Sequence, residues 1–221
     1  MIILTDLSEV LISGVYGVDE LIMQKYGEQV AEAFLDRCEE TKPFFFELMR
    51  GHFRERQFWE IFMEEGYWPF SLEEIEDFLS QNFMQEVPGT LDVYKRIIEY
   101  PETTKPGARI LQGRPEIWIV SDHIAERREE IELYHPEEFR IASRKLWSYG
   151  FGLVKEDRGF FERLLYNNRK KPEEVIFVDD MIINLYSASR AGIASIAFID
   201  ANHLQREMEE YGFKFAAPKT R

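Results

Sequence analysis

The chain has 221 residues, enough for one large domain or for a core domain with a smaller insertion. Aspartate and glutamate outnumber lysine and arginine by 41 to 27, which gives a net charge of -14, and no basic cluster is long enough to follow a phosphate backbone. We therefore expect no nucleic acid partner, although a metal ion and a few well-placed donors would still allow an anionic substrate.

The first predicted element is a short buried strand over residues 2–5. It is followed by Asp6, whose side chain is expected at the C-terminal tip of the strand. From about residue 18 to residue 83, apolar residues recur at steps of three or four, which indicates four or five helices. Ser71 and Glu74 have the spacing of a capping box that opens one of these helices.

This helical segment is predicted to be an insertion, because Pro88-Gly89 closes it before a different pattern begins. We expect a helical cap over residues 15–87 and a core made from residues 1–14 and 88–221. The single cysteine, Cys38, lies at helical spacing from apolar neighbours. We interpret it as a buried small hydrophobe and not as a nucleophile or metal ligand.

Helices and strands alternate in the remainder of the chain, which predicts a parallel sheet covered on both faces. The helices are expected at residues 91–100, 125–133, 158–166, 184–191 and 203–211, and the strands at 117–120, 139–142, 175–178 and 194–199. Residues 101–115 are the one long loop candidate. The predicted fold is α/β, a Rossmann-like doubly wound parallel sheet with an inserted α-helical cap.

The N-terminal sequence has no basic leader, and no apolar run approaches the roughly 20 residues that cross a bilayer. We therefore expect a cytoplasmic protein without a membrane partner.

Polar residues stand at the ends of three predicted strands: Asp6, Ser121 and the pair Asp179-Asp180. In an open parallel sheet the ligand site lies beyond the carboxyl ends of the strands, so these groups are expected to converge. Carboxylates that meet at one edge repel each other unless a cation lies between them, and an all-oxygen set favours Mg²⁺. Lys155 follows a glycine-containing segment that we expect to be flexible, and it could bring a fixed positive charge to the same place.

These residues resemble the four motifs of the haloacid dehalogenase (HAD) superfamily, in the same order. The segment DLSEVL from Asp6 resembles the first motif, Ser121 at the end of a hydrophobic strand the second, Lys155 in VKEDRGFF the third, and VIFVDDMIIN the fourth. The helical segment after the first motif matches the position of the C1-type cap of that family. The resemblance covers nearly the whole chain.

The resemblance implies a hydrolase in which Asp6 attacks a phosphoryl group and forms an aspartyl-phosphate. Ser121 and Lys155 would hold the phosphoryl oxygens, and Asp122 is the neighbouring candidate for substrate binding. Magnesium would be bound by Asp6, the backbone carbonyl of Ser8 and Asp180, with Asp179 acting directly or through water. Asn184 would support this loop.

The sequence departs from the family pattern at two positions. Ser8 stands where the phosphatases usually have an aspartate that protonates the leaving group and activates water, which serine cannot do at neutral pH. Loss of such help costs about 10²–10⁴-fold in rate and would favour good leaving groups, such as an anomeric sugar phosphate. Asp122 stands where an asparagine often follows the second motif.

The leading hypothesis is a magnesium-dependent phosphomonoesterase that acts on a small phosphorylated metabolite, as a monomer or homodimer. Two alternatives remain: a HAD-fold binding or regulatory protein weakened by Ser8, and a metal-independent haloacid dehalogenase. The four histidines show no ligand spacing. Arg50 ends a helix from which it could reach the active site, although a surface position is the more common one for arginine.

Overall fold

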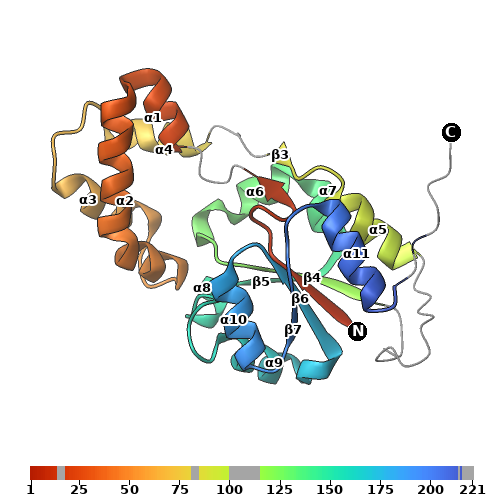
Figure 1. Cartoon of the computed structure of the whole chain (residues 1–221). Helices are drawn as coiled ribbons and strands as arrows, with labels where there is room; N and C mark the ends of the chain where they lie inside the picture. Colours follow the sequence, from red (N-terminus) through yellow and green to blue (C-terminus); the bar gives the residue numbers. More distant parts are fainter. Residues whose placement is uncertain (14–17, 81–84, 100–114, 214, 216–221) are drawn as a thin grey trace, which may run out of the picture.

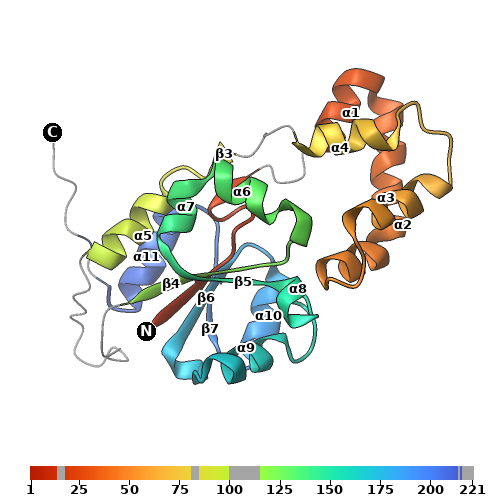
Figure 2. The ribbon, with the colours of Figure 1, turned by 180° about the vertical axis from the view of Figure 1, so that it is seen from behind.

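The computed structural model describes residues 1–13, 18–80, 85–99, 115–213 and 215 (Figure 1). It contains a sheet with helices on both faces and, beside it, a separate group of helices (Figures 1 and 2). That separate group is α1 (Val18–Tyr26), α2 (Glu28–Met49), α3 (Glu55–Glu64) and α4 (Leu72–Ser80). We call these four helices the cap, and its predicted limits at residues 15 and 87 stay a prediction.

The sheet is parallel and has the strand order β5-β4-β1-β6-β7. The strands are β1 (Ile2–Thr5), β4 (Glu116–Ser121), β5 (Ala142–Trp147), β6 (Val175–Asp179) and β7 (Ala194–Ala197). Every residue of β1 and β6 is buried, because both faces of these inner strands are covered. The predicted α/β fold with a parallel sheet is therefore confirmed.

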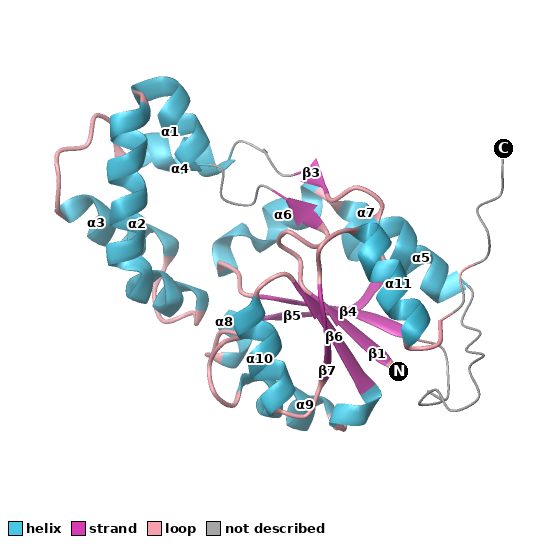
Figure 3. Cartoon of the chain, viewed as in Figure 1, coloured by secondary structure: helices cyan, strands magenta, loops and turns pink. Residues whose placement is uncertain are grey.

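Helices lie on both faces of the sheet (Figure 3). Alternate residues of the strands pack into two separate apolar layers, one on each face. Ile3 and its neighbours on β4 and β6 pack against α5 (Thr90–Glu99), α6 (Arg128–Tyr134), α7 (Pro136–Arg140) and α11 (Ala201–Glu210). Ile2 and Leu4 face α9 (Phe160–Asn168) and α10 (Ile182–Arg190). Two short 3-10 turns, Ala125–Arg127 and Pro172–Glu174, precede α6 and β6.

The strand predicted at residues 139–142 is wrong. Pro136 lies at the first position of the helix α7, whose first turn carries two glutamates, and the strand β5 begins only at Ala142. The polar residues of β5 give it no apolar run that would predict a strand. An edge strand can expose such residues, because it pairs on one side only. The segment expected to be flexible before Lys155 forms the short helix α8 (Ser148–Phe151).

Two short strands lie where the chain leaves the core and returns to it. β2 (Ile12–Ser13) and β3 (Gln85–Glu86) pair antiparallel, and the amide of Val87 donates to the carbonyl oxygen of Leu11 at 2.9 Å. Residues 85–87, which the predicted boundary assigns to the cap, thus contact the N-terminal segment of the core.

Two smaller expectations concern local structure. The capping box at Ser71 and Glu74 is confirmed: the Glu74 amide donates to Ser71 Oγ at 3.3 Å, and the Ser71 amide donates to Glu74 Oε2 at 3.1 Å. The long loop predicted at residues 101–115 lies outside the described residues except for Pro115.

None of the helices in the described part of the chain combines the length and the hydropathy that a membrane crossing requires.

Candidate active site

Three neighbouring strands bring their C-terminal ends to one edge of the sheet. β1 lies between β4 and β6, and Thr5 is in register with Ile119 on one side and Val178 on the other. Asp6 continues this register, because its amide donates to the carbonyl oxygen of Val178 at 2.9 Å. Asp6, Ser121 and Asp179 are therefore placed at adjacent strand ends and all three are buried.

Three carboxylates converge at this edge. One oxygen from each of Asp6, Asp179 and Asp180 lies within 4.8 Å of the other two. Burial raises the pKa of Asp6 well above its ordinary value, and the charge of Asp179 adds to this effect against the opposing charge of Lys155. Burial and the charge of Asp179 also raise the pKa of Asp180. The three carboxylates thus exceed the one nearby positive charge, and a hard divalent cation with oxygen ligands would balance them.

Lys155 is the cation in direct contact with this cluster. Its Nζ lies 2.7 Å from Asp6 Oδ2 and 2.7 Å from Asp179 Oδ2, and its side chain is 3% exposed. Burial alone would favour the neutral amine, but the attraction of Asp6, Asp179 and Asp122 outweighs it and raises the pKa of Lys155 above its ordinary value. Lys155 is therefore charged at all physiological pH values.

Asp179 is held by its neighbours on the chain. The amide of Met181 donates to Asp179 Oδ1 at 2.8 Å, and Asn184 Nδ2 lies 3.1 Å from the same oxygen. Asn184 is buried in the first turn of α10. These two donors and Lys155 bind the carboxylate oxygens of Asp179, whereas the side chain of Asp180 is only half-buried and has fewer protein partners. The supporting position expected for Asn184 agrees with this geometry.

The residues at the end of β4, which the sequence assigned to substrate binding, make hydrogen bonds within the protein. Both carboxylate oxygens of Asp122 accept from the amide of Lys155, at 3.0 and 3.2 Å. Burial raises the pKa of Asp122 to about 6, against the lowering effect of Lys155. Ser121 Oγ donates to the carbonyl oxygen of Asp122 at 3.4 Å, a long and weak bond. Asp122 thus fixes the loop that carries Lys155.

Ser8 lies in a tight turn directly after Asp6. The amides of Leu11 and Ile12 both donate to the carbonyl oxygen of Leu7, at 2.9 and 3.0 Å. The next residue, Glu9, is exposed and has a φ of 57°, in the left-handed region. The side chain of Ser8 is half-buried, and its hydroxyl provides no carboxylic acid for the leaving group.

The end of α2 contacts the core beside these loops. Arg50 forms a bidentate salt bridge to Asp157, with Nε 2.7 Å from Oδ2 and Nη2 2.5 Å from Oδ1. Asp157 also accepts from the amide of Val154, next to Lys155. Arg50 is therefore neither a free surface residue nor in contact with the carboxylate cluster. The sequence offered one signal for this pair, the position of Asp157 two residues after Lys155.

Two further cap–core contacts were not predicted from the sequence. Ser148 Oγ donates to the carbonyl oxygen of Met49 at 2.6 Å and accepts from the amide of His123 at 3.1 Å. Arg127 Nε lies 2.8 Å from both carboxylate oxygens of Glu55, which is 7% exposed. Burial lowers the pKa of His123 to about 4. No sequence pattern identifies the two cap–core pairs, because their partners lie 99 and 72 residues apart.

Comparison with solved structures identifies the fold. A HAD family enzyme from Bacteroides thetaiotaomicron, solved in complex with magnesium and inorganic phosphate, superposes with a TM-score of 0.65 at 18% identity, covering 92% of this chain and 98% of that one. A predicted HAD-like hydrolase from Porphyromonas gingivalis gives 0.65 at 15% identity, covering 95% and 96%. L-2-haloacid dehalogenase from Xanthobacter autotrophicus gives 0.62 at 12% identity, covering 95% and 82%.

Sequence comparison adds one distant similarity. No family model matches the chain. Drimenol cyclase from Aspergillus calidoustus is 26% identical over 129 residues, which are 58% of this chain and 20% of that protein. The chain thus spans about a fifth of the length of this curated relative. The structural matches confirm the predicted fold, a HAD-like core with a helical cap.

Proposed function

We propose that this chain, which has the HAD fold, is a magnesium-dependent phosphomonoesterase with Asp6 as its nucleophile. The observation that carries the proposal is the convergence of Asp6, Asp179 and Asp180 within 4.8 Å, with Lys155 Nζ 2.7 Å from Asp6. Titratable groups whose pKa values are strongly perturbed by burial and by one another are typical of catalytic sites. The structural neighbour from Bacteroides thetaiotaomicron, complexed with magnesium and inorganic phosphate, supports the same assignment.

In the proposed reaction, a carboxylate oxygen of Asp6 attacks the phosphorus atom of the substrate. The bond from phosphorus to the ester oxygen breaks, the alcohol leaves, and water then hydrolyses the aspartyl-phosphate to release phosphate. Lys155 and the hydroxyl of Ser121 would hold the phosphoryl oxygens, with Asp122 fixing the loop of Lys155. The donors on Asp179 and the register of β1 hold these groups in place before substrate arrives.

The residues present fit a magnesium ion. Asp6, Asp180 and the backbone carbonyl of Ser8 would hold it, with Asp179 acting directly or through water, and the ion would neutralise charge on the transferred phosphoryl group. All of these ligands are oxygen atoms, the type that Mg²⁺ prefers. The raised pKa values of Asp6 and Asp180 indicate a site that gains stability when a cation enters.

Ser8 restricts the substrates that the proposed site would hydrolyse. Without an aspartate at this position the leaving alcohol must depart with little acid help, so esters with good leaving groups are expected to react fastest. Substrates of this kind include aryl phosphates and anomeric sugar phosphates. The expected substrate is a small phosphorylated molecule.

The test is release of phosphate from a panel that includes p-nitrophenyl phosphate and anomeric sugar phosphates, with Mg²⁺ and with EDTA. Asp6→Asn is the matched control, because it keeps the shape of the side chain and removes the nucleophile. Turnover that needs Mg²⁺ and disappears in Asp6→Asn is the expected result. Binding of Mg²⁺ without turnover of any ester would instead favour a binding or regulatory protein, and halide release without metal would favour a dehalogenase.

A further inference from the structure

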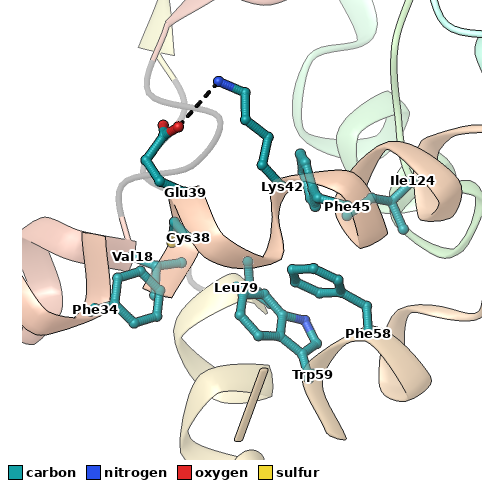
Figure 4. A pocket seen from close by; sticks show the side chains of 10 residues that line it. All are labelled: Val18, Phe34, Cys38, Glu39, Lys42, Phe45, Phe58, Trp59, Leu79 and Ile124. Carbon is teal, nitrogen blue, oxygen red and sulfur yellow. Dashed lines mark hydrogen bonds and ion pairs between the residues drawn. The ribbon is translucent and has the colours of Figure 1, made fainter. Parts of the chain in front are cut away.

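The cap contains a cavity of about 240 Å³ beside the core (Figure 4). Phe34, Phe58 and Trp59 of the cap line it together with Ile124, which belongs to the core, and all four side chains are at most 6% exposed. Protein interiors contain few voids larger than a water molecule. A space of this size among buried aromatic side chains is therefore unusual, and it is partly open to solvent, so that a ligand can enter it.

The lining of the cavity offers almost no hydrogen-bonding partners. Trp59 Nε1 is directed to Glu55 Oε1 at 3.4 Å. The charged residues of the lining, Glu39 and Lys42, have side chains that are 77% and 53% exposed, and Glu39 Oε2 lies 3.4 Å from Lys42 Nζ (Figure 4). A buried water needs two to four polar partners, and a buried sugar hydroxyl without a partner is costly. The occupant that fits this lining is a hydrocarbon group.

One lining residue of the cavity follows closely in sequence on Ser121, which the proposed function assigns to phosphate binding. Ile124 follows Asp122 by two residues and Ser121 by three, so its Cα is within about 11 Å of the Cα of Ser121. The helix α2, which lines the cavity with Phe34, also ends beside this edge, where Met49 accepts from Ser148. The end of β4 is thus joined to the lining of the cavity by a short stretch of chain.

We infer that this cavity binds an apolar group of the substrate, so that the chain acts on phosphate esters of hydrophobic alcohols in preference to sugar phosphates. The inference rests on the proposed phosphatase for the phosphate half of the ligand and on the cavity for the other half. Its volume exceeds the roughly 150 Å³ of an apolar cavity that accepts benzene, so a branched or ring-containing hydrocarbon group fits.

The test compares phenyl phosphate with 4-butylphenyl phosphate, two esters whose leaving groups have similar reactivity but differ in apolar length. Each buried carbon of the butyl group is expected to favour the longer ester about fourfold, so its four carbons should raise kcat/KM by up to roughly 250-fold. The variant Cys38→Trp places a large ring in the cavity and should remove most of this preference. Leu79→Trp enters the same cavity from α4 and serves if the first variant does not fold.

The matched control is Leu35→Trp, which adds the same ring to α2 at a position that is 47% exposed and outside the cavity. It should keep the preference of the unaltered chain. Equal kcat/KM for the two esters, or a preference that survives both cavity variants, would overturn the inference and leave the phosphatase proposal standing.

Calorimetric titration with 4-butylphenol tests the cavity without any hydrolysis. Binding to the unaltered chain that Cys38→Trp removes and Leu35→Trp retains is expected. If this pattern appears while no ester is hydrolysed, the cavity assignment stands and the phosphatase proposal fails. If 4-butylphenol does not bind the unaltered chain, the cavity assignment fails.

Discussion

Replacement of Asp122 by asparagine is expected to stabilise the fold above pH 6. Burial raises the pKa of Asp122 from its ordinary value of 3.8 to about 6. The folded state therefore binds a proton more tightly than the unfolded state, and stability falls as pH rises from about 4 to about 6. Each pKa unit is worth about 1.4 kcal/mol, so the ionised carboxylate costs up to about 3 kcal/mol, an upper bound because the side chain is only partly buried.

Asp122→Asn removes this charge and keeps an oxygen that can accept from the amide of Lys155. Urea unfolding and thermal unfolding in EDTA at pH 4.5 and pH 8 measure the effect. At pH 8 the variant should gain up to about 3 kcal/mol, or roughly 6 to 12 °C in Tm for a chain of this size. At pH 4.5 most of the gain should disappear. A variant no more stable than the parent at pH 8, or equally stabilised at both pH values, would refute the reasoning.

Three other outcomes are expected. Lys155→Met leaves Asp6 and Asp179 without their cation and should lower the free energy of unfolding in EDTA by about 3–5 kcal/mol, with partial recovery in Mg²⁺; an unchanged urea midpoint would contradict the paired arrangement. Because burial raises the pKa values of Asp6 and Asp180, protons compete with the metal. The Kd for Mg²⁺ measured by calorimetry should therefore be larger at pH 5.5 than at pH 7.5, and equal values would contradict this competition. Cys38 is only half-buried, but burial still raises the pKa of its thiol to about 12, so iodoacetamide at pH 8 should alkylate it much more slowly in the folded chain than after unfolding, as followed by mass spectrometry. Equal labelling rates before and after unfolding would contradict this.

The inner strands and the chemical groups at their ends were readable from the sequence. Fully buried parallel strands appear as short apolar runs, so the ends of β1, β4 and β6 marked Asp6, Ser121 and Asp179 without any knowledge of the neighbouring strands. The helical insertion and its capping box were also readable, because helix periodicity and capping depend on residues three or four positions apart. These features are local in the chain.

The features that only the tertiary structure decided depend on partners far apart in the chain. β5 is an edge strand whose polar residues are tolerated because one side faces solvent, so its pattern carried no strand signal. The bridge from Arg50 to Asp157 joins residues 107 positions apart, and the use of Asp122 to hold the amide of Lys155 joins residues 33 apart. The apolar cavity beside Ile124 likewise brings together residues of all four cap helices and one residue of the core. Local periodicity thus indicates the helices and the buried inner strands, but the edge strand and the distances between elements, and hence the site and the cavity, follow from packing.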